Sequence, residues 1–464
     1  MGDVVVQGEN KISTIQDLGS FSMNISQLKL MPSFMGEQDV FRFMQLMVGV
    51  SSGKEGSSEL NIRGGSADQT QILLDDVPIY NQSHAFGLVS IFSGEAIKSA
   101  ELFKGYSSPM YGGRLSGVAS LYMRDGNKYE HKQALQLGTT TLSATLEGPL
   151  KRGKGSYLFS GRQFTPYLLM QGIYACLSKY NATLPQFNFY DITGKLSYDL
   201  GKNNSLYLSF YKGNDLFGSN FWNSERSYEN GKVEHISKSK AGVRWGNTIA
   251  SLRWNSVLGS KLFMNNIVYY SFLGNDKFSN FENYREKYNY ESKIKSQMDE
   301  IGFKTNFNYS VSRGYKISYG ANLSQQYFKP QITSSNRNGL TNKMDYGKRN
   351  LLTVAAYMNN EFTYRKMVFN AGLRVGMYDN SEDVVYSVEP RLSISYNIDN
   401  QSSIWVSYEN NAQPLFSLNK YYFSIPIDYW IPFSGKKIQR SNQISLGYRK
   451  SFDNGLSFSS ELYY

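Results

Sequence analysis

The part of the chain after residue 128 alternates between apolar and polar residues with a period of two. In residues 300–311 the apolar positions are Ile301, Phe303, Phe307, Tyr309 and Val311, and most of the positions between them are polar. Residues 367–377 and 391–399 repeat the alternation. Successive side chains of a β-strand point to opposite faces, so the pattern predicts strands with one apolar and one polar face.

The connections between these strands alternate in length. Short turns with residues that tolerate positive φ are expected at 200–204, 259–260, 398–401 and 453–455. Long polar segments are expected as loops at 165–188, 214–244, 274–298, 328–350 and 411–440. All the short turns would then lie at one end of the sheet, as in outer-membrane β-barrels. A soluble sandwich or adhesin-like domain is the alternative, although five such loops are unusual in a compact domain.

The composition narrows the class of protein. The 464 residues include 36 Tyr and are 15% aromatic, and aromatic residues near strand ends would form girdles at the membrane interfaces. No apolar run approaches the length of a transmembrane helix. The single Cys176 cannot form an intramolecular disulfide, and His84, His131 and His235 suggest no catalytic constellation. We therefore expect a protein that is not an enzyme and that has no cofactor and no metal site.

The first 128 residues have a different character, with short mixed segments separated by glycines. Within residues 35–49, Val40, Phe43, Met44 and Met47 recur at helical spacing and predict a short helix with a buried face. We therefore divide the chain into a small α+β domain at 1–128 and an antiparallel barrel at 129–464. The start at Met1 shows no secretory signal, so an exported protein would begin here after its leader.

Four segments of the first domain occur in a set order: NIRGG, QILLDDVPIYN, FGLVSIFSGEAIKSAELFKG and YGGRLSGVASL. Together they resemble the plug domain of TonB-dependent outer-membrane transporters over residues 35–125. Downstream, VEPRLSISYNI and the segment from QPLF to ISLGY resemble barrel strands of the same family, especially of its Bacteroidetes-type members. Asp76 departs from the pattern, which usually has Gly there, and predicts a slightly different turn.

By this resemblance, a set of residues in the first domain forms the plug motif, and their chemistry indicates what each could do. Arg63 can make planar bidentate contacts with a carboxylate on the inner barrel wall, and glycines would allow tight turns and close approach of the backbone. The motif residues are Arg63, Gly64, Gly65, Asp75, Asp76, Pro78, Gly105, Tyr111, Gly112 and Gly113. A turn-forming role for Asp75 and Asp76 is favoured over metal binding or catalysis. The single RGG and the lack of a phosphate-binding glycine motif argue against a nucleic-acid partner and a nucleotide site.

Two further sites follow from the resemblance. Asp3, Val4, Val5 and Val6 resemble the end of a TonB box, an extended segment that adds to a partner's sheet edge, although an ordinary first plug strand fits equally well. Tyr80, Asn81, Gln82 and His84 follow the Val-Pro turn and would reach the plug apex, where they would bind substrate. The alternative for His84 is that it caps a turn or packs on the barrel wall.

The resemblance implies a receptor in the outer membrane of a Gram-negative bacterium that imports a scarce, bulky solute. A ferric siderophore or similar metal complex is the leading solute, and an oligosaccharide, peptide or cobalamin is the alternative. A surface receptor or adhesin that does not transport is an alternative of another class. Expected partners are TonB, outer-membrane lipid and lipopolysaccharide, the small-molecule or glycan ligand, and a surface lipoprotein. We count about 14 strands where plugged barrels have 22, and therefore expect an incomplete barrel and a truncated chain.

Overall fold

The computed structural model describes residues 19–24, 39–53, 57–177, 185–226, 233–336, 340–345, 347–419, 428–454 and 456–464. Most of these residues lie in two sheets, a small one near the N-terminus and a large one that follows it. The two α-helices that it describes are α2 (Val40–Met44) and α3 (Thr165–Leu177). Neither of these described helices has the length and apolar character that crossing a membrane requires.

The N-terminal domain is built on a five-stranded sheet with the order β1-β8-β9-β4-β5. Strands β4 and β9 run parallel, and the other neighbours are antiparallel. The strands are β1 (Ser20–Asn24), β4 (Thr70–Leu74), β5 (Val77–Ile79), β8 (Ile97–Phe103) and β9 (Gly117–Met123). Short elements surround this sheet: the pair β2 (Val50–Ser51) and β3 (Asn61–Ile62), the pair β6 (Ser83–His84) and β7 (Val89–Ser90), and the 3-10 turns η2 (Ala67–Gln69) and η3 (Ala85–Gly87).

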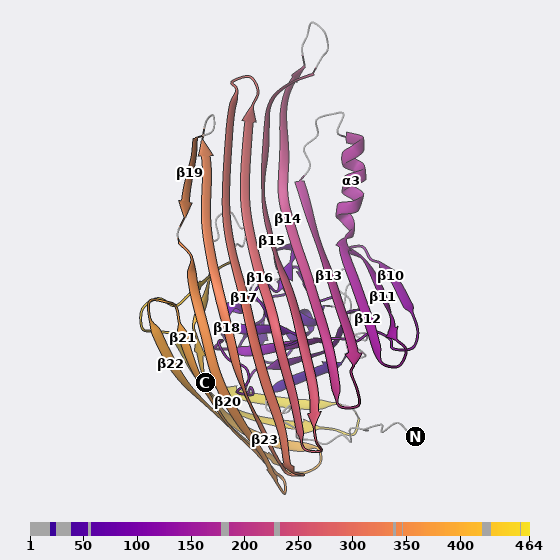
Figure 1. Cartoon of the computed structure of the whole chain (residues 1–464), viewed down its shortest axis with the longest axis vertical. Coiled ribbons are helices and arrows are strands. Elements are labelled where there is room, and N and C mark those ends of the chain that lie inside the picture. The colour runs from indigo at the N-terminus through magenta and orange to yellow at the C-terminus, as the bar shows by residue number, and fades with distance from the viewer. Residues whose placement is uncertain are drawn as a thin grey trace.

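The large sheet is antiparallel, and its strands pair in the order in which they occur in the sequence (Figure 1). Fifteen strands form the path, and β19 pairs with β18 beside it. They are β10 (Lys132–Leu137), β11 (Thr141–Lys151), β12 (Gly155–Phe164), β13 (Pro185–Asp199), β14 (Asn204–Arg226), β15 (Val233–Leu258), β16 (Leu262–Asn283), β17 (Tyr288–Ser312), β18 (Tyr315–Asn336), β19 (Leu340–Asp345), β20 (Arg349–Tyr364), β21 (Met367–Asp379), β22 (Val384–Asn397), β23 (Ser402–Gln413), β26 (Gln439–Ser451) and β27 (Ser457–Tyr463). A separate hairpin of β24 (Leu415–Asn419) and β25 (Asp428–Pro432) lies between β23 and β26 in the sequence.

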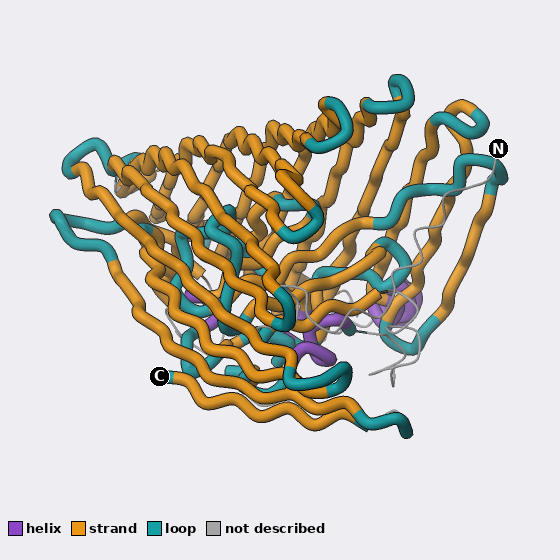
Figure 2. The backbone as a smooth tube through the Cα atoms, turned by 90° about the horizontal axis from the view of Figure 1, so that it is seen from below, coloured by secondary structure: helices purple, strands orange, loops and turns teal. Residues whose placement is uncertain are grey.

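The large sheet curves around the N-terminal domain (Figure 2). Its path begins with β10 and ends with β27, and within the described ranges no pairing joins these two strands. The last strand of the small sheet ends at Met123 and the first strand of the large sheet begins at Lys132. The division of the chain at residue 128 stays a proposal.

The predicted alternation of apolar and polar faces is confirmed in the large sheet. In β17, Ile301 is 55% exposed, whereas its neighbour Glu300 is 2% exposed and faces the enclosed domain. Leu373 on β21 and Leu392 on β22 are likewise exposed on the outer face. The apolar face therefore points outward, which is the arrangement expected of a sheet in a lipid bilayer.

The loops predicted at 214–244 and 274–298 are wrong in extent, because most of these residues are strand. Strands β14 and β15 run to Arg226 and from Val233, and the next long hairpin turns between Asn283 and Tyr288. The period-two signal fades there because a strand that extends beyond the membrane can be polar on both faces. The segment 165–188, also predicted as a loop, contains α3.

The helix predicted near residue 40 is present but short. Asp39 caps α2, since its Oδ1 accepts hydrogen bonds from the backbone N–H of Phe41 at 2.8 Å and of Arg42 at 3.3 Å. The buried side chains of α2 are Val40, Phe41 and Met44. The predicted stripe included Phe43, which is only partly buried, and missed Phe41, because the helix ends after little more than one turn.

The linker from the plug to the barrel passes close to the backbone of β12 at Gly126. A Cβ atom added at Gly126 would collide with the carbonyl group of Tyr157, whereas one added at Gly201 would meet no atom within 4 Å. We expect Gly126→Ala to destabilise the folded chain by about 1–3 kcal/mol, because a backbone group cannot move aside like a flexible side chain. Thermal unfolding of the purified protein measures this, with Gly201→Ala as the matched control. Equal unfolding midpoints for the two variants would contradict the close approach.

Candidate functional site

Arg63 of the NIRGG segment makes a buried ion pair with the wall of the large sheet. Its Nη2 lies 3.0 Å from Oε2 of Glu461 on β27, and its Nη1 donates to Ser445 Oγ on β26. Lys104 Nζ approaches the same carboxylate at 3.7 Å and donates to the carbonyl of Val48 at 2.7 Å. Two plug cations therefore share one carboxylate of the barrel wall. The contact to Glu461 uses one guanidinium nitrogen and is not bidentate.

The turn between β4 and β5 forms a second buried contact with the wall. Asp75 and Asp76 both adopt the left-handed backbone region, with φ of 47° and 63°, which Asp tolerates better than most residues. Asp76 Oδ2 lies 2.8 Å from Arg253 Nη2 on β15. Asp75 Oδ2 accepts from Ser209 Oγ at 2.7 Å and lies 3.4 Å from Lys195 Nζ. The aspartates thus form the turn and also hold it against β13–β15.

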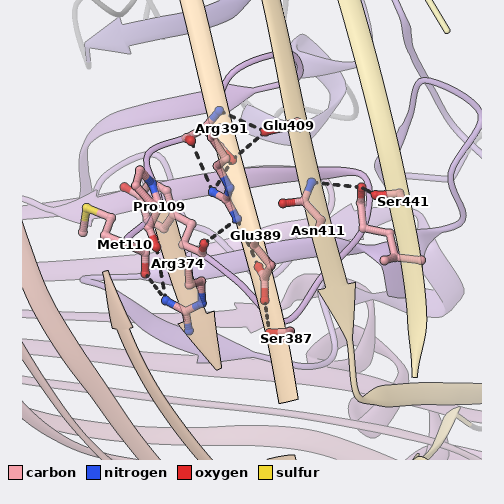
Figure 3. Close-up of polar contacts among 12 residues, drawn as sticks. Pro109, Met110, Arg374, Ser387, Glu389, Arg391, Glu409, Asn411 and Ser441 are labelled. Carbon is pink, nitrogen blue, oxygen red and sulfur yellow. Dashed lines mark hydrogen bonds and ion pairs between the residues drawn. The ribbon is translucent and has the colours of Figure 1, made fainter. Parts of the chain in front are cut away.

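Side chains of the wall hold the segment after β8 through hydrogen bonds to its backbone (Figure 3). Arg391 Nη1 on β22 donates to the carbonyl oxygen of Ser108 at 2.8 Å, and its Nη2 donates to that of Tyr111 at 2.9 Å. Arg374 on β21 donates to the carbonyl oxygen of Pro109 at 3.2 Å. The carboxylate of Glu409 on β23 accepts from the backbone N–H of Ser107 at 3.2 Å.

The glycines of the motif allow the wall to approach the plug closely. A Cβ atom on Gly112 would overlap the guanidinium group of Arg374, so a side chain there would displace this contact. Gly64 and Gly113 have backbone φ angles of 79° and 86°, which residues other than glycine rarely adopt. Gly65 packs against Ser116, and Gly105 lies beside Gly19.

The sequence did not identify Arg374, Arg391, Glu409 or Glu461 as contact residues. They belong to strands whose outer faces are apolar, and the signal that could have found them is charge on the inward-facing positions of these strands. A charge on that face needs a partner inside the barrel, because an unpaired buried charge costs several kcal/mol.

Three of the four predicted substrate-binding residues, Tyr80, Asn81 and His84, contact strands of the wall between β13 and β18. The Tyr80 hydroxyl donates to Glu300 on β17, and the backbone N–H of Asn81 donates to Asn247 Oδ1 on β15 at 3.2 Å. Gln82 is partly buried, and its carbonyl oxygen accepts from the N–H of Ile91. The ring of His84 stacks on Phe189 at a centroid distance of 4.7 Å. The role of these residues in binding substrate stays a prediction.

His84 is the centre of a buried charged cluster. Its Nδ1 lies 2.7 Å from Asp215 Oδ2 on β14, and its Nε2 lies 3.1 Å from Asp191 Oδ2 on β13. Arg162 Nη2 on β12 lies 2.7 Å from the same Asp191 oxygen. Burial lowers the pKa of the imidazole, but the two carboxylates outweigh it and raise the pKa of His84 to about 9. His84 is therefore protonated at neutral pH and fixes the loop to the wall.

A cleft lies between the plug and strands β16–β21. Its free space is about 740 Å³, including the part that is open to solvent. Polar and charged side chains of the lining include Arg114 of the plug and Glu300, Lys304 and Arg374 of the wall. The β24–β25 hairpin contributes Leu415 to this lining.

A group of aromatic rings surrounds Phe86, which lies two residues after His84. The ring centroid of Phe86, a residue of η3, lies 5.0 Å from that of Trp245, 5.2 Å from that of Phe217 and 6.1 Å from that of Phe187. Phe164 extends the group at 5.0 Å from Phe187. Cleft and rings together supply hydrogen-bond donors, an acceptor and flat apolar faces, which suit non-covalent binding of a solute. Over the described ranges, no group of three or more His, Cys, Asp or Glu side chains is arranged to hold a metal ion.

These features define a class of protein: a membrane β-sheet of the barrel type whose interior is filled by a folded plug. Residues 29–118 match the family described as TonB-dependent Receptor Plug Domain. No curated protein sequence matches the chain at a significant level.

Solved structures share this fold at low sequence identity. The siderophore receptor PirA from Acinetobacter baumannii is 16% identical with a TM-score of 0.66, and the match covers 97% of this chain and 70% of PirA. The ferric yersiniabactin uptake receptor FyuA from Yersinia pestis is 11% identical with a TM-score of 0.63, covering 96% and 71%. A ferric enterobactin receptor mutant from Pseudomonas aeruginosa, in complex with enterobactin, is 16% identical with a TM-score of 0.60, covering 97% and 72%.

Residues 29–118 therefore form a plug domain of the TonB-dependent receptor family, and the chain shares the fold of such receptors. A plug domain of this family implies a protein of the Gram-negative outer membrane that interacts with TonB and binds a small-molecule ligand. The candidate TonB box at Asp3–Val6 lies outside the described residues.

The His84 cluster predicts a stability that depends on pH. The pKa of His84 is raised from 6.5 to about 9 in the folded chain, so folding favours the protonated form. This contribution is complete below about pH 6.5 and is lost as the pH rises through about 9. It amounts to about 3 kcal/mol at most.

Thermal unfolding of the wild type and of His84→Gln across this pH window tests the prediction. The wild type should lose stability relative to the variant as the pH rises, because the variant has no group that titrates at this position. Parallel pH profiles for the two proteins would show that His84 does not hold the loop through its charge.

Proposed function

We propose that this receptor imports a ferric siderophore, and that the solute first binds to the aromatic group around Phe86. The observation that carries the proposal is the position of Phe86, which an apex loop of the plug presents among rings of β13, β14 and β15. The neighbours PirA, FyuA and the enterobactin receptor are named as siderophore or ferric-siderophore receptors, which supports this choice of solute.

The backbone of the apex loop supports a binding role for Phe86. Ala85 and Phe86 have φ of 56° and 58°, a conformation that costs non-glycine residues about 1–3 kcal/mol each. The backbone N–H of Ala85 donates to Asp215 Oδ1 at 3.0 Å, so the wall holds the strained loop in place. Strain of this kind is concentrated at functional sites. Aromatic faces at this position would stack on the planar groups of a chelate.

Energy coupling would act from the other end of the plug. In this proposal Asp3–Val6 form the TonB box and add a strand to the edge of a TonB sheet. A pull on this segment would be transmitted to the plug, which must break its contacts with the wall before a solute can pass. Outer-membrane lipid and lipopolysaccharide would surround the apolar outer face, and a surface lipoprotein is a further proposed partner.

A binding assay and an uptake assay separate the two parts of the proposal. Phe86→Ala should weaken binding of a ferric siderophore about five- to thirty-fold, as expected when about 1–2 kcal/mol of stacking is lost. Phe281→Ala, which removes an aromatic residue of β16 away from this group, is the control. Val5→Pro should abolish uptake and leave binding intact, because proline cannot donate a strand hydrogen bond.

A panel of solutes decides between siderophores and the alternatives. Purified protein is titrated with catecholate, hydroxamate and carboxylate ferric siderophores, and with cobalamin, oligosaccharides and short peptides. Binding of a siderophore together with TonB-dependent iron uptake supports the proposal. Binding of an oligosaccharide, peptide or cobalamin alone would replace it with the alternative solute. Surface binding with no TonB-dependent uptake would favour a receptor or adhesin that does not transport.

A further inference from the structure

The cleft between the plug and strands β16–β21 contains more positive than negative charge. Its lining includes the cations Arg114, Lys304 and Arg374, and one carboxylate, that of Glu300. Tyr80 and Tyr269 both donate hydroxyl hydrogen bonds to Glu300, which occupies its two oxygens. These neutral donors leave the negative charge of Glu300 in place, so the lining carries three cations against one anion.

Arg374 is a buried cation whose hydrogen bonds are incomplete. Its side chain is 3% exposed, and its Nη1 donates only to the carbonyl oxygens of Pro109 and Met110, at 3.2 and 3.4 Å. Its Nε is buried and has no hydrogen-bond partner. Glu389 lies opposite Arg374 in the β21–β22 register. Its Oε1 accepts from Ser387 at 2.6 Å and Tyr378 at 3.3 Å, and its Oε2, which has no hydrogen bond to a described residue, lies 3.6 Å from Arg391 Nη2.

Arg114 is the second cation with weak partners. It donates to the carbonyl oxygens of Gly113 at 3.3 Å and Leu415 at 3.4 Å, and its guanidinium lies 4.6 Å from the ring centroid of Trp430. For the part of the wall and plug that the structure describes, no carboxylate oxygen forms an ion pair within 4.0 Å of Arg114 or Arg374.

A desolvated guanidinium without a counter-ion is costly, and an arriving oxyanion would remove this cost. The planar guanidinium group matches the geometry of carboxylate and phosphate oxygens. Three neutral side chains of β18, those of Asn322, Ser324 and Gln326, also line the cleft. The amide of Asn322 donates to the carbonyl oxygen of Met110 at 3.1 Å, and that of Gln326 donates to the Tyr80 hydroxyl at 3.0 Å.

We propose that this cleft is an oxyanion-binding site, in which Arg114 and Arg374 bind a carboxylate or phosphate group of a solute. The inference rests on the proposed function only in assigning that group to the imported solute. Lys304, whose Nζ donates to the carbonyl of Asp76 at 2.6 Å, adds positive charge to the same space.

Trp430 provides a reporter for this site because it is in contact with Arg114. The purified full chain is titrated with sodium citrate and, separately, with inorganic phosphate at constant ionic strength, and tryptophan fluorescence is followed. We expect a saturable change with at least one of the two anions, and expect it to disappear in Trp430→Phe. A response to citrate alone assigns a carboxylate site, a response to phosphate alone assigns a phosphate site, and a response to both assigns a general oxyanion site.

Variants locate the binding. Arg114→Gln and Arg374→Gln should each weaken binding about ten- to a hundred-fold, the loss expected for a hydrogen bond to a charged group. Arg114→Lys should retain part of the affinity. Arg391→Gln is the matched control, because Arg391 is a buried arginine on the next strand that contacts the plug but does not line the cleft.

Three results would overturn the proposal: no saturable response of the wild type to either anion in the millimolar range, unchanged affinity in both cleft variants, or equal loss in Arg391→Gln. If Arg374→Gln does not fold, Arg114→Gln decides, since Arg114 is only partly buried. Anion binding is measured on purified protein and solute uptake in cells. Failure of the oxyanion site is therefore distinguishable from failure of the proposed import.

Discussion

Buried ion pairs between the plug and the inner face of the sheet hold the two parts of this structure together. The plug residues Arg63 and Lys104 form ion pairs with Glu461 of the wall. Asp76 of the plug pairs with Arg253, and His84 of the plug pairs with Asp191 and Asp215. Each of these paired charges would be costly without its partner, so the stability of the sheet and that of the plug depend on the contact between them. The outer face of the sheet is apolar and is therefore stable in contact with lipid.

The distribution of these contacts suggests how the interior is organised for passage of a solute. On β21–β23, Arg374, Arg391 and Glu409 hold the backbone of the segment between β8 and β9. Between the plug and β16–β21 lies the cation-lined cleft, which Arg374 also borders. A solute that reached this space would replace weak guanidinium contacts before it disturbed the stronger ion pairs.

Much of the architecture follows from sequence, and the contacts between its parts do not. Period-two alternation predicted the strands and their apolar faces, because the membrane imposes it on every strand. It could not predict how far β14–β17 extend beyond the membrane, since that constraint ends there. The plug motif pointed to Arg63, Asp75 and Asp76, whereas their partners Glu461, Lys195 and Arg253 lie on strands distant in the sequence. Locally, Asp75 and Asp76 have only the character of turn residues, and the fold is needed to show that they also hold the plug. For Arg63 the sequence predicted a carboxylate partner on the wall but not which residue supplies it.

The shared carboxylate of Glu461 gives the most direct test that buried charge pairing holds the plug. Glu461→Gln leaves Arg63 and Lys104 as two neighbouring buried cations, whereas Arg63→Gln leaves Glu461 paired with Lys104. Chemical unfolding of the purified chain should show a loss of about 3–5 kcal/mol for Glu461→Gln and a smaller loss for Arg63→Gln. Lys316→Gln, which breaks an ion pair whose lysine side chain is 58% exposed, is the control and should cost less than about 1 kcal/mol. Losses for Glu461→Gln no larger than that of the control would contradict the account.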